Sequence, residues 1–268
     1  MRAVSLCIIS LWLLACNTAN NTTESTNVNN LDAPKVLQYE IVKIHPHDTS
    51  SYTQGLVFNG EKLIESTGNY GRSILHILDP NMKQVGAKVI LPSTDFGEGT
   101  TLFNNKIYQL TWKEKKVMVY DATTLTKIKE LYWPYEGWGL THNDSSIIVS
   151  TGGSNIYFVN PEDFSIQRTI GVYNNYGYVS DINELEYVDG KLYANIYGQN
   201  EVVVIEPETG QVLNNINFSN LLAQANVKYD PATIDVGYVL NGIAYQQKSK
   251  TFFMTGKCWP VMVEIKLK

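Results

Sequence analysis

A pattern that occurs five times along the chain constrains its fold more than any other feature. Each copy begins with a short strand-like segment at 54–56, 98–100, 138–140, 183–185 or 241–243. A polar turn and a second apolar strand follow, as Asn59-Gly60 precedes Leu63-Ile64 in the first copy, and this order indicates a β-hairpin. Successive copies begin 44, 40, 45 and 58 residues apart. Repeats of this length, built from short strands, predict propeller blades.

The rest of each copy supplies further strands. Third strands are expected at 74–78, 117–120, 156–159, 202–205 and 261–265, and fourth strands at 87–91, 126–132, 165–170 and 211–217. The fifth copy reaches Lys268 without a fourth strand, whereas Val36–Ile44 is a strand without a partner. We therefore predict an all-β, five-bladed propeller with four-stranded antiparallel blades, in which this N-terminal strand closes the last blade. The extra length at 218–238 is expected to be an insertion over one face, with a short helix at 220–225.

Aligning the copies predicts two rings of side chains on one face of the disc. The first ring, at the starts of the innermost strands, contains Gln54, Glu98, Trp138, Asn183 and Asn241. The second ring, at the ends of the second strands, contains Gly68, Trp112, Gly152, Tyr197 and Gly256-Lys257, where the glycines leave room for neighbours. Such positions often only cover the edge of a core. As a set they favour a small-ligand site with polar groups and aromatic walls.

The first 34 residues have the pattern of an export leader and a tether. Arg2 precedes the apolar run Ala3–Ala15, which is too short to span a bilayer and is typical of a signal peptide. The run ends in Leu13-Leu14-Ala15-Cys16, which resembles a bacterial lipobox and implies a lipid on Cys16; ordinary cleavage near Ala15 is the alternative. We predict a lipoprotein signal at 1–15, a disordered tether at 16–34 and the propeller at 35–268. The protein would then be exported and lipid-anchored in the bacterial cell envelope, on the periplasmic side or at the surface.

Charge and cysteine content exclude other classes of function. The formal net charge is −5 and no run of basic residues is present, which argues against nucleic-acid binding. Cys7 belongs to the predicted leader and Cys16 to the anchor, so Cys258 has no partner for an intramolecular disulfide. We interpret Cys258 as a packed residue rather than a nucleophile. A closed propeller without an unusual apolar patch is expected to be a monomer.

Five segments together resemble the motif series of the plant-type and bacterial glutamine cyclotransferases, also called glutaminyl-peptide cyclotransferases. These segments are Tyr52-Thr53-Gln54-Gly55-Leu56, Phe96-Gly97-Glu98-Gly99, Glu136-Gly137-Trp138-Gly139-Leu140-Thr141, Ile182-Asn183-Glu184-Leu185-Glu186 and Thr255-Gly256-Lys257-Cys258-Trp259-Pro260. The resemblance covers about residues 36–268. It implies a five-bladed propeller that converts N-terminal glutamine of peptides and proteins to pyroglutamate and releases ammonia.

The resemblance also implies roles for single residues. Glu98 matches the family's proton-transfer acid, and Lys257 and Asn183 match further catalytic positions. The substrate-binding positions are matched by Gln54, Phe96, Trp112, Trp138, Tyr197 and Tyr52. Two of these depart from the family pattern, which usually has Phe at the position of Tyr52 and Trp at that of Tyr197. Both changes bear on substrate preference more than on the reaction.

The implied reaction needs no Ser or Cys nucleophile. The substrate's own α-amine attacks its side-chain amide, and an α-amine with a pKa of about 7.7–8.0 is partly neutral at working pH. The protein must hold the side chain curled, stabilise an oxyanion and move a proton. We expect Trp112, Trp138 and Phe96 to perform the first task, Lys257 and Asn183 the second, and Glu98 the third.

Other interpretations remain open at this stage. A non-catalytic lipoprotein propeller that binds peptide or sugar would keep the aromatic ring but would not need Glu98. A propeller hydrolase needs a metal cage of several carboxylates, and a redox-cofactor propeller usually has more blades. His45-Pro46-His47-Asp48 is a weak zinc candidate. We expect no metal and no required cofactor in the site; a structural calcium ion in the channel is compatible with the sequence but not specified by it.

Overall fold

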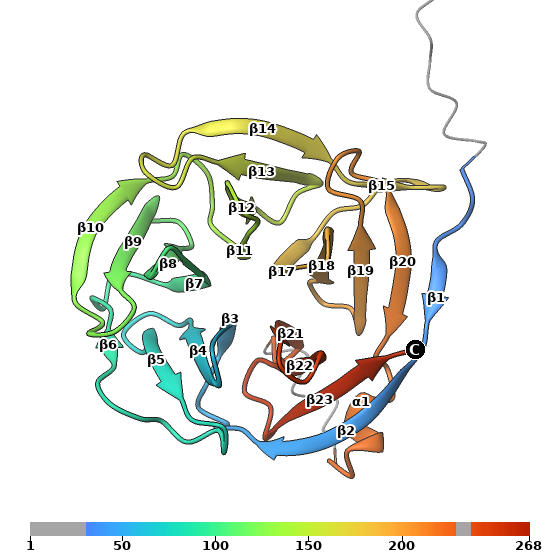
Figure 1. Ribbon diagram of the computed structural model, residues 1–268, viewed down its shortest axis with the longest axis horizontal. Helices are drawn as coiled ribbons and strands as arrows, with labels where there is room; N and C mark the ends of the chain where they lie inside the picture. The colour runs from blue at the N-terminus through green and yellow to red at the C-terminus, as the bar shows by residue number, and fades with distance from the viewer. Residues whose placement is uncertain (1–30, 229–236) are drawn as a thin grey trace, which may run out of the picture.

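The computed structural model describes residues 31–228 and 237–268, which form five small sheets arranged as blades around a central axis (Figure 1). The innermost strands of the blades are β3 (Thr53–Asn59), β7 (Gly97–Phe103), β11 (Leu140–His142), β17 (Ile182–Val188) and β21 (Leu240–Gln246). The five-bladed propeller predicted from the repeats is therefore confirmed. The predicted signal peptide, Cys16 and most of the tether lie outside the described residues.

Each blade is antiparallel and grows outward from its inner strand. The second strands are β4 (Lys62–Thr67), β8 (Lys106–Thr111), β12 (Ile147–Ser150), β18 (Lys191–Ile196) and β22 (Thr251–Gly256). The third strands are β5 (Ile74–Leu78), β9 (Lys116–Asp121), β13 (Asn155–Val159), β19 (Glu201–Ile205) and β23 (Val261–Leu267). The outer strands are β6 (Val89–Ile90), β10 (Lys127–Tyr132), β14 (Ile166–Gly171), β20 (Val212–Asn217) and β2 (Tyr39–Pro46).

The N-terminal strand closes the ring as predicted. β2 pairs antiparallel with β23, from Tyr39 opposite Leu267 to Pro46 opposite Val261, and becomes the outer strand of the fifth blade. The preceding strand, β1 (Lys35–Leu37), pairs parallel with β20 and adds a fifth strand to the fourth blade. The segment from β1 to β2 therefore joins the outer edges of two neighbouring blades (Figure 1), and only its second half was foreseen.

Two small elements complete the described structure. The predicted short helix is present as α1 (Leu221–Gln224), beside the closing strand β2, where the Tyr39 hydroxyl donates a 2.8 Å hydrogen bond to Gln224. Residues 229–236 of the same insertion lie outside the described residues. A hairpin of β15 (Tyr173–Asn174) and β16 (Gly177–Tyr178) was not predicted from the sequence. Among the residues described, no helix has the length and apolar character needed to cross a membrane.

The core is divided among the five contacts between neighbouring blades. Each blade is covered on both faces, which explains continuous apolar strands such as Ile147-Ile148-Val149, all fully buried. Trp133 and Tyr108 of the second blade, for example, share one cluster with Leu140 and Phe164 of the third. The outer strands, such as β10, are largely exposed. Because blades pack face against face, their inner strand ends are held at fixed positions around the axis.

Near the axis the inner strands approach so closely that the repeated position is glycine in four of the five blades. A Cβ atom at Gly99 would lie 2.5 Å from the carbonyl oxygen of Trp138, in the neighbouring blade. The fourth blade carries Glu184 at this position instead. Its buried carboxylate accepts hydrogen bonds from the backbone N–H groups of Leu56, at 3.3 Å, and Ile243, at 2.7 Å. Glu184 thus joins the inner strands of the first, fourth and fifth blades.

Candidate active site

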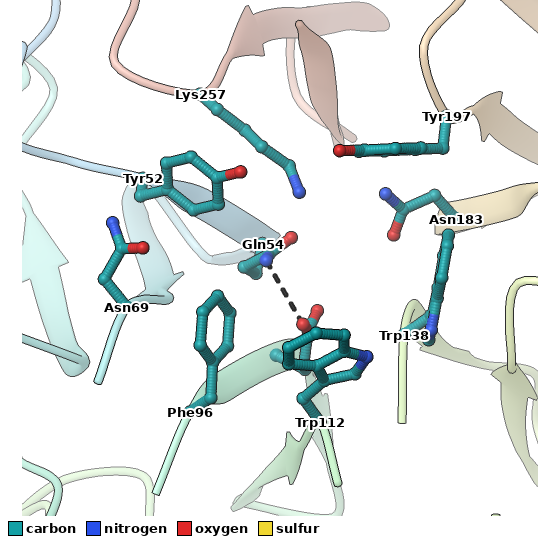
Figure 2. Close-up of a pocket in the computed structure, with 10 residues that line it drawn as sticks. Tyr52, Gln54, Asn69, Phe96, Trp112, Trp138, Asn183, Tyr197 and Lys257 are labelled. Atoms are coloured by element: carbon teal, nitrogen blue, oxygen red, sulfur yellow. Dashed lines mark hydrogen bonds between the residues drawn. The ribbon is translucent and has the colours of Figure 1, made fainter. Parts of the chain in front are cut away.

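One face of the propeller contains a cavity of about 240 Å³ near the axis, lined by side chains from all five blades (Figure 2). The lining residues are Tyr52, Gln54, Asn69, Phe96, Glu98, Trp112, Trp138, Asn183, Tyr197 and Lys257. They come from the starts of inner strands and the ends of second strands, as the two predicted rings require. All nine site residues predicted from the sequence therefore lie around one cavity; their roles stay predictions.

Two residues differ from the ring alignment. Asn69 lines the cavity but was not predicted; it follows Gly68 and has a positive φ of 87°, so its side chain turns back toward the site. Examining the position after the second ring could have found it. Asn241 belongs to the first ring but does not line the cavity. It is buried, and its Nδ2 donates to the Thr53 carbonyl at 3.0 Å and to Gln54 Oε1 at 3.4 Å. Asn241 thus orients Gln54.

Glu98 is the buried acid of the site. Its side chain accepts a 3.2 Å hydrogen bond from Gln54 Nε2, the dashed line of Figure 2, and the residue is only 5% exposed. Burial raises the pKa of Glu98 well above its ordinary value, and the negative charges of Glu114 and Glu136 add to the increase, while Lys257 opposes it. A carboxyl whose pKa is raised in this way keeps its proton to higher pH and can donate it to a reacting group.

Lys257 is the buried cation of the site. Its Nζ atom lies over two rings, 4.7 Å from the Tyr52 centroid and 5.0 Å from that of Tyr197. Burial lowers the pKa of Lys257 to about 8, although Glu98 favours its charged form. Figure 2 shows that the ammonium group points into the cavity from the fifth blade, on the side opposite Phe96 and Trp112.

Aromatic rings form the walls, and glycines allow them to lie flat against the backbone. A Cβ atom at Gly68 would lie 2.6 Å from Cζ of Phe96, and one at Gly152 would lie 2.6 Å from the Trp138 indole. The room left by these second-ring glycines is occupied by a ring of the next blade at Gly68 and by a ring of the same blade at Gly152. Phe96 also packs against Trp112, with ring centroids 5.5 Å apart, and Trp138 against Tyr197, at 5.6 Å.

Asn183 offers an unused acceptor. The residue is 2% exposed, and within the described part of the chain its Oδ1 atom has no hydrogen-bond partner. A buried amide oxygen without a partner is costly, so a ligand that supplies an N–H group gains a favourable bond there. A ligand that carries a free amine or a primary amide can donate such a hydrogen bond to Asn183.

Comparison with known proteins agrees with this geometry. The sequence profile of the glutamine cyclotransferase family matches residues 8–267. The chain belongs to the glutamine cyclotransferase family.

Two relatives in the glutamine cyclotransferase family illustrate how far the similarity extends. A glutaminyl-peptide cyclotransferase of Arabidopsis thaliana is 34% identical over 236 residues, which cover 87% of this chain and 72% of that protein. The crystal structure of Myxococcus xanthus glutaminyl cyclase superposes with a TM-score of 0.80 at 33% identity, covering 88% of this chain and 98% of that one. The family resemblance inferred from the five motifs is therefore confirmed.

The side chains of the zinc candidate His45-Pro46-His47-Asp48 contact separate partners. His45 pairs with Glu264 at 3.1 Å and His47 with Glu65 at 3.0 Å, while Asp48 caps the backbone of Ser50. Within residues 31–228 and 237–268, no group of three or more His, Cys, Asp or Glu side chains is placed to hold a metal ion.

Cys258 lies outside the cavity lining, and its thiol has a pKa raised by burial. Both observations make it a poor nucleophile, because the thiolate is the reactive form.

Proposed function

We propose that this protein is a glutaminyl-peptide cyclotransferase that closes the N-terminal glutamine of peptides and proteins to pyroglutamate and releases ammonia. The observation that carries the proposal is the buried Glu98 carboxyl, which faces a cavity with aromatic walls and the buried cation Lys257. Both named relatives carry this activity in their names. A non-catalytic peptide-binding propeller has no use for an acid whose ionisation is suppressed in this way.

Substrate positioning is the first part of the reaction. The glutamine side chain must curl until its α-nitrogen meets its own amide carbon, and a cavity of about 240 Å³ between Phe96, Trp112 and Trp138 accommodates one curled side chain. Holding the reacting atoms together in this way removes much of the entropic barrier. The free Oδ1 of Asn183 supplies an acceptor for an N–H group of the substrate.

Proton transfer is the second part. The α-nitrogen forms a bond to the amide carbon, the carbonyl oxygen gains negative charge, and the bond to the amide nitrogen then breaks. Lys257 Nζ and the Asn183 amide group supply donors for the oxyanion. The Glu98 carboxyl donates its proton to the departing nitrogen and takes up the proton that the attacking nitrogen loses, so that ammonia leaves and the carboxyl is regenerated.

Ammonia release from a Gln-initiated dipeptide tests the proposal, with the purified full chain and with Glu98→Gln. The wild type is expected to release ammonia, also after treatment with a chelator, because the steps above use only side chains. Glu98→Gln is expected to lose about 10²–10⁴-fold in kcat and still bind the dipeptide. Turnover of the variant at the wild-type rate would contradict the role of Glu98. Binding without turnover by the wild type would favour the binding-module alternative.

We also propose that the protein is exported and lipid-anchored at Cys16, with the propeller as a monomer outside the cytoplasm. Support comes from the sequence alone: the apolar run, the Leu13-Leu14-Ala15-Cys16 segment and the Asn- and Thr-rich stretch that follows. Expression in a bacterial host with a radiolabelled fatty acid tests the anchor. The wild type should carry the label and sediment with membranes, and Cys16→Ser should do neither. Label retained by the variant would place the lipid elsewhere.

A further inference from the structure

We propose that Glu136, which does not line the cavity, is a positioning residue that holds the two indole walls of the site at their working separation. Its Oε2 atom accepts one hydrogen bond from Trp112 Nε1, at 2.8 Å, and another from Trp138 Nε1, at 3.3 Å. Trp112 follows the end of β8 and Trp138 precedes β11, so the two rings belong to different blades. One carboxylate oxygen therefore links both walls. This inference rests on the proposed function of the same site.

The backbone of Glu136 is anchored independently of its side chain. The fully buried Trp133 donates from Nε1 to the Glu136 carbonyl oxygen at 3.2 Å, and the Gly137 N–H donates to the Trp112 carbonyl at 2.9 Å. The carboxylate thus extends from a point fixed to the core between the second and third blades. Hydrogen bonds made from a fixed backbone position lose less conformational entropy than those from a mobile loop.

Lys113 and Glu114, which follow Trp112 in the sequence, also contact wall residues of the cavity. Lys113 Nζ lies 4.0 Å from its Oε1 and 3.8 Å from the Trp112 ring centroid, so this cation covers the outer side of the same wall. Glu114 holds the other side of the site in a similar way, because it accepts from the Tyr70 hydroxyl at 2.9 Å and from the Phe96 N–H at 3.3 Å. The side chain of Glu136 is 44% exposed, so replacing it leaves the core intact.

The position of Glu136 has two separable consequences. As a hydrogen-bond acceptor it sets the spacing of the walls, and with it the fit of the curled substrate. As a negative charge it raises the pKa of Glu98, together with Glu114 and against Lys257, after the larger effect of burial. A neutral acceptor in its place should preserve the first effect and remove the second.

Steady-state kinetics of Glu136→Ala, Glu136→Gln and the control Glu162→Ala with a Gln-initiated dipeptide test the inference. Glu162 is a 70% exposed carboxylate that pairs with Lys106 and does not line the cavity. Glu136→Ala is expected to raise KM about tenfold with a smaller change in kcat, since two indole hydrogen bonds are lost. Glu136→Gln should restore most of the KM. In both Glu136 variants the limb of the pH–rate profile that reports Glu98 should move to lower pH, because a negative charge near Glu98 is lost. The control should match the wild type.

Three outcomes would overturn the inference: a wild-type KM in Glu136→Ala, equal KM defects in the Ala and Gln variants, or the same defect in the control. Acrylamide quenching of indole fluorescence without substrate separates it from the proposed function. Glu136→Ala should show greater quenching than Glu136→Gln and the wild type, even if no Gln-initiated peptide is turned over. Equal quenching in all three would mean that Glu136 does not hold the walls.

Discussion

The second-ring glycines shape the cavity because they have no side chain. At Gly68 and Gly152 the missing side chain is replaced by the ring of a wall residue, Phe96 in one case and Trp138 in the other. The backbone at the end of a second strand therefore supports an aromatic ring, from the next blade at Gly68 and from the same blade at Gly152. Neither glycine lies in the cavity wall, yet each sets how far a ring extends into the cavity.

Substitution at Gly68 measures this effect. Gly68→Ala places a methyl group 2.6 Å from Phe96 Cζ, which forces the ring to shift into the cavity. We expect kcat/KM for a Gln-initiated dipeptide to fall about tenfold, with a fall in Tm of a few degrees for the repacking. Gly153→Ala is the matched control, because its Cβ meets only Thr151 Oγ1 at 4.0 Å. Unchanged kinetics in Gly68→Ala would show that Phe96 does not shape the cavity.

At the scale of elements, a buried network joins the closing strand to the loop that carries Lys257. Glu65 in β4 accepts hydrogen bonds from His47 Nε2 at 3.0 Å, from His76 Nε2 at 2.9 Å and from the Thr53 hydroxyl at 2.7 Å. The other ring nitrogen of His47 donates to the Trp259 carbonyl oxygen at 2.9 Å. His47, directly after β2, thus links the ring closure, the first blade and the 257–259 turn.

The network predicts a pH-dependent contribution to stability. Burial opposes ionisation of Glu65, but the charge of His47 and the hydrogen bonds from both histidines outweigh it and hold the pKa of Glu65 well below its ordinary value. Stability from Glu65 is present above its unfolded pKa of about 4.3 and is lost as the pH falls below that value. Burial also opposes the charged form of His47, but the negative charge of Glu65 and the hydrogen bonds of His47 together outweigh burial and raise the pKa of His47. The stability that charged His47 contributes is therefore complete below its unfolded pKa of about 6.5 and is lost as the pH rises.

Glu65→Gln should therefore lower Tm most between about pH 4.5 and 6.5, where breaking a buried ion pair costs about 3–5 kcal/mol. The difference from the wild type should shrink at about pH 3. Thermal unfolding at pH 3, 5.5 and 8 measures it. A difference that is the same at all three pH values would mean that the network is not ionised.

At the scale of the whole molecule, buried carboxyl groups join blades across the central axis. Glu186 in β17 accepts from the Tyr245 N–H at 2.9 Å and from the Thr141 hydroxyl at 3.3 Å, so it connects the third, fourth and fifth blades. Glu184, two residues earlier in the strand, connects the first, fourth and fifth blades. Burial raises the pKa of both carboxyls, that of Glu186 to about 8, although hydrogen bonds to the carboxylate oppose the shift. The disc is therefore held together at its centre by groups that resist ionisation.

This arrangement predicts that stability falls as the pH rises through the weakly acidic and neutral range. The stability that a protonated Glu186 provides is complete below its unfolded pKa of about 4.3 and is lost as the pH rises through about 8. The loss amounts to at most about 1.4 kcal/mol per pH unit. Glu186→Gln removes the titration and keeps an acceptor, so its Tm should rise relative to the wild type from pH 5 to pH 9.

Calorimetry at pH 5, 7 and 9 measures the Glu186 effect, with Glu208→Gln as a control at a 76% exposed carboxylate. A Tm difference between Glu186→Gln and the wild type that is independent of pH would mean that Glu186 does not titrate in this range.

Repeat spacing alone determined the number of blades, the closing strand and the two rings, because equivalent positions in a closed ring must meet near its axis. The nine predicted cavity residues follow from those rings and from the family motifs. Asn69, by contrast, depends on the backbone turn after Gly68, and Glu136 depends on where two indole N–H groups meet. Neither residue belongs to the two rings that the repeat alignment defines.

The parallel pairing of β1 with β20 also required the tertiary structure, since its partner lies far along the chain. Glu184 and Glu186 lie in one of the five family motifs, and the close approach of the inner strands buries them against backbone N–H groups. The sequence by itself determined which residues reach the axis, because the repeat period decides that. Packing between the blades decided which of them face the cavity and which hold the disc together, because the separation of inner strands is set by contacts between residues distant along the chain.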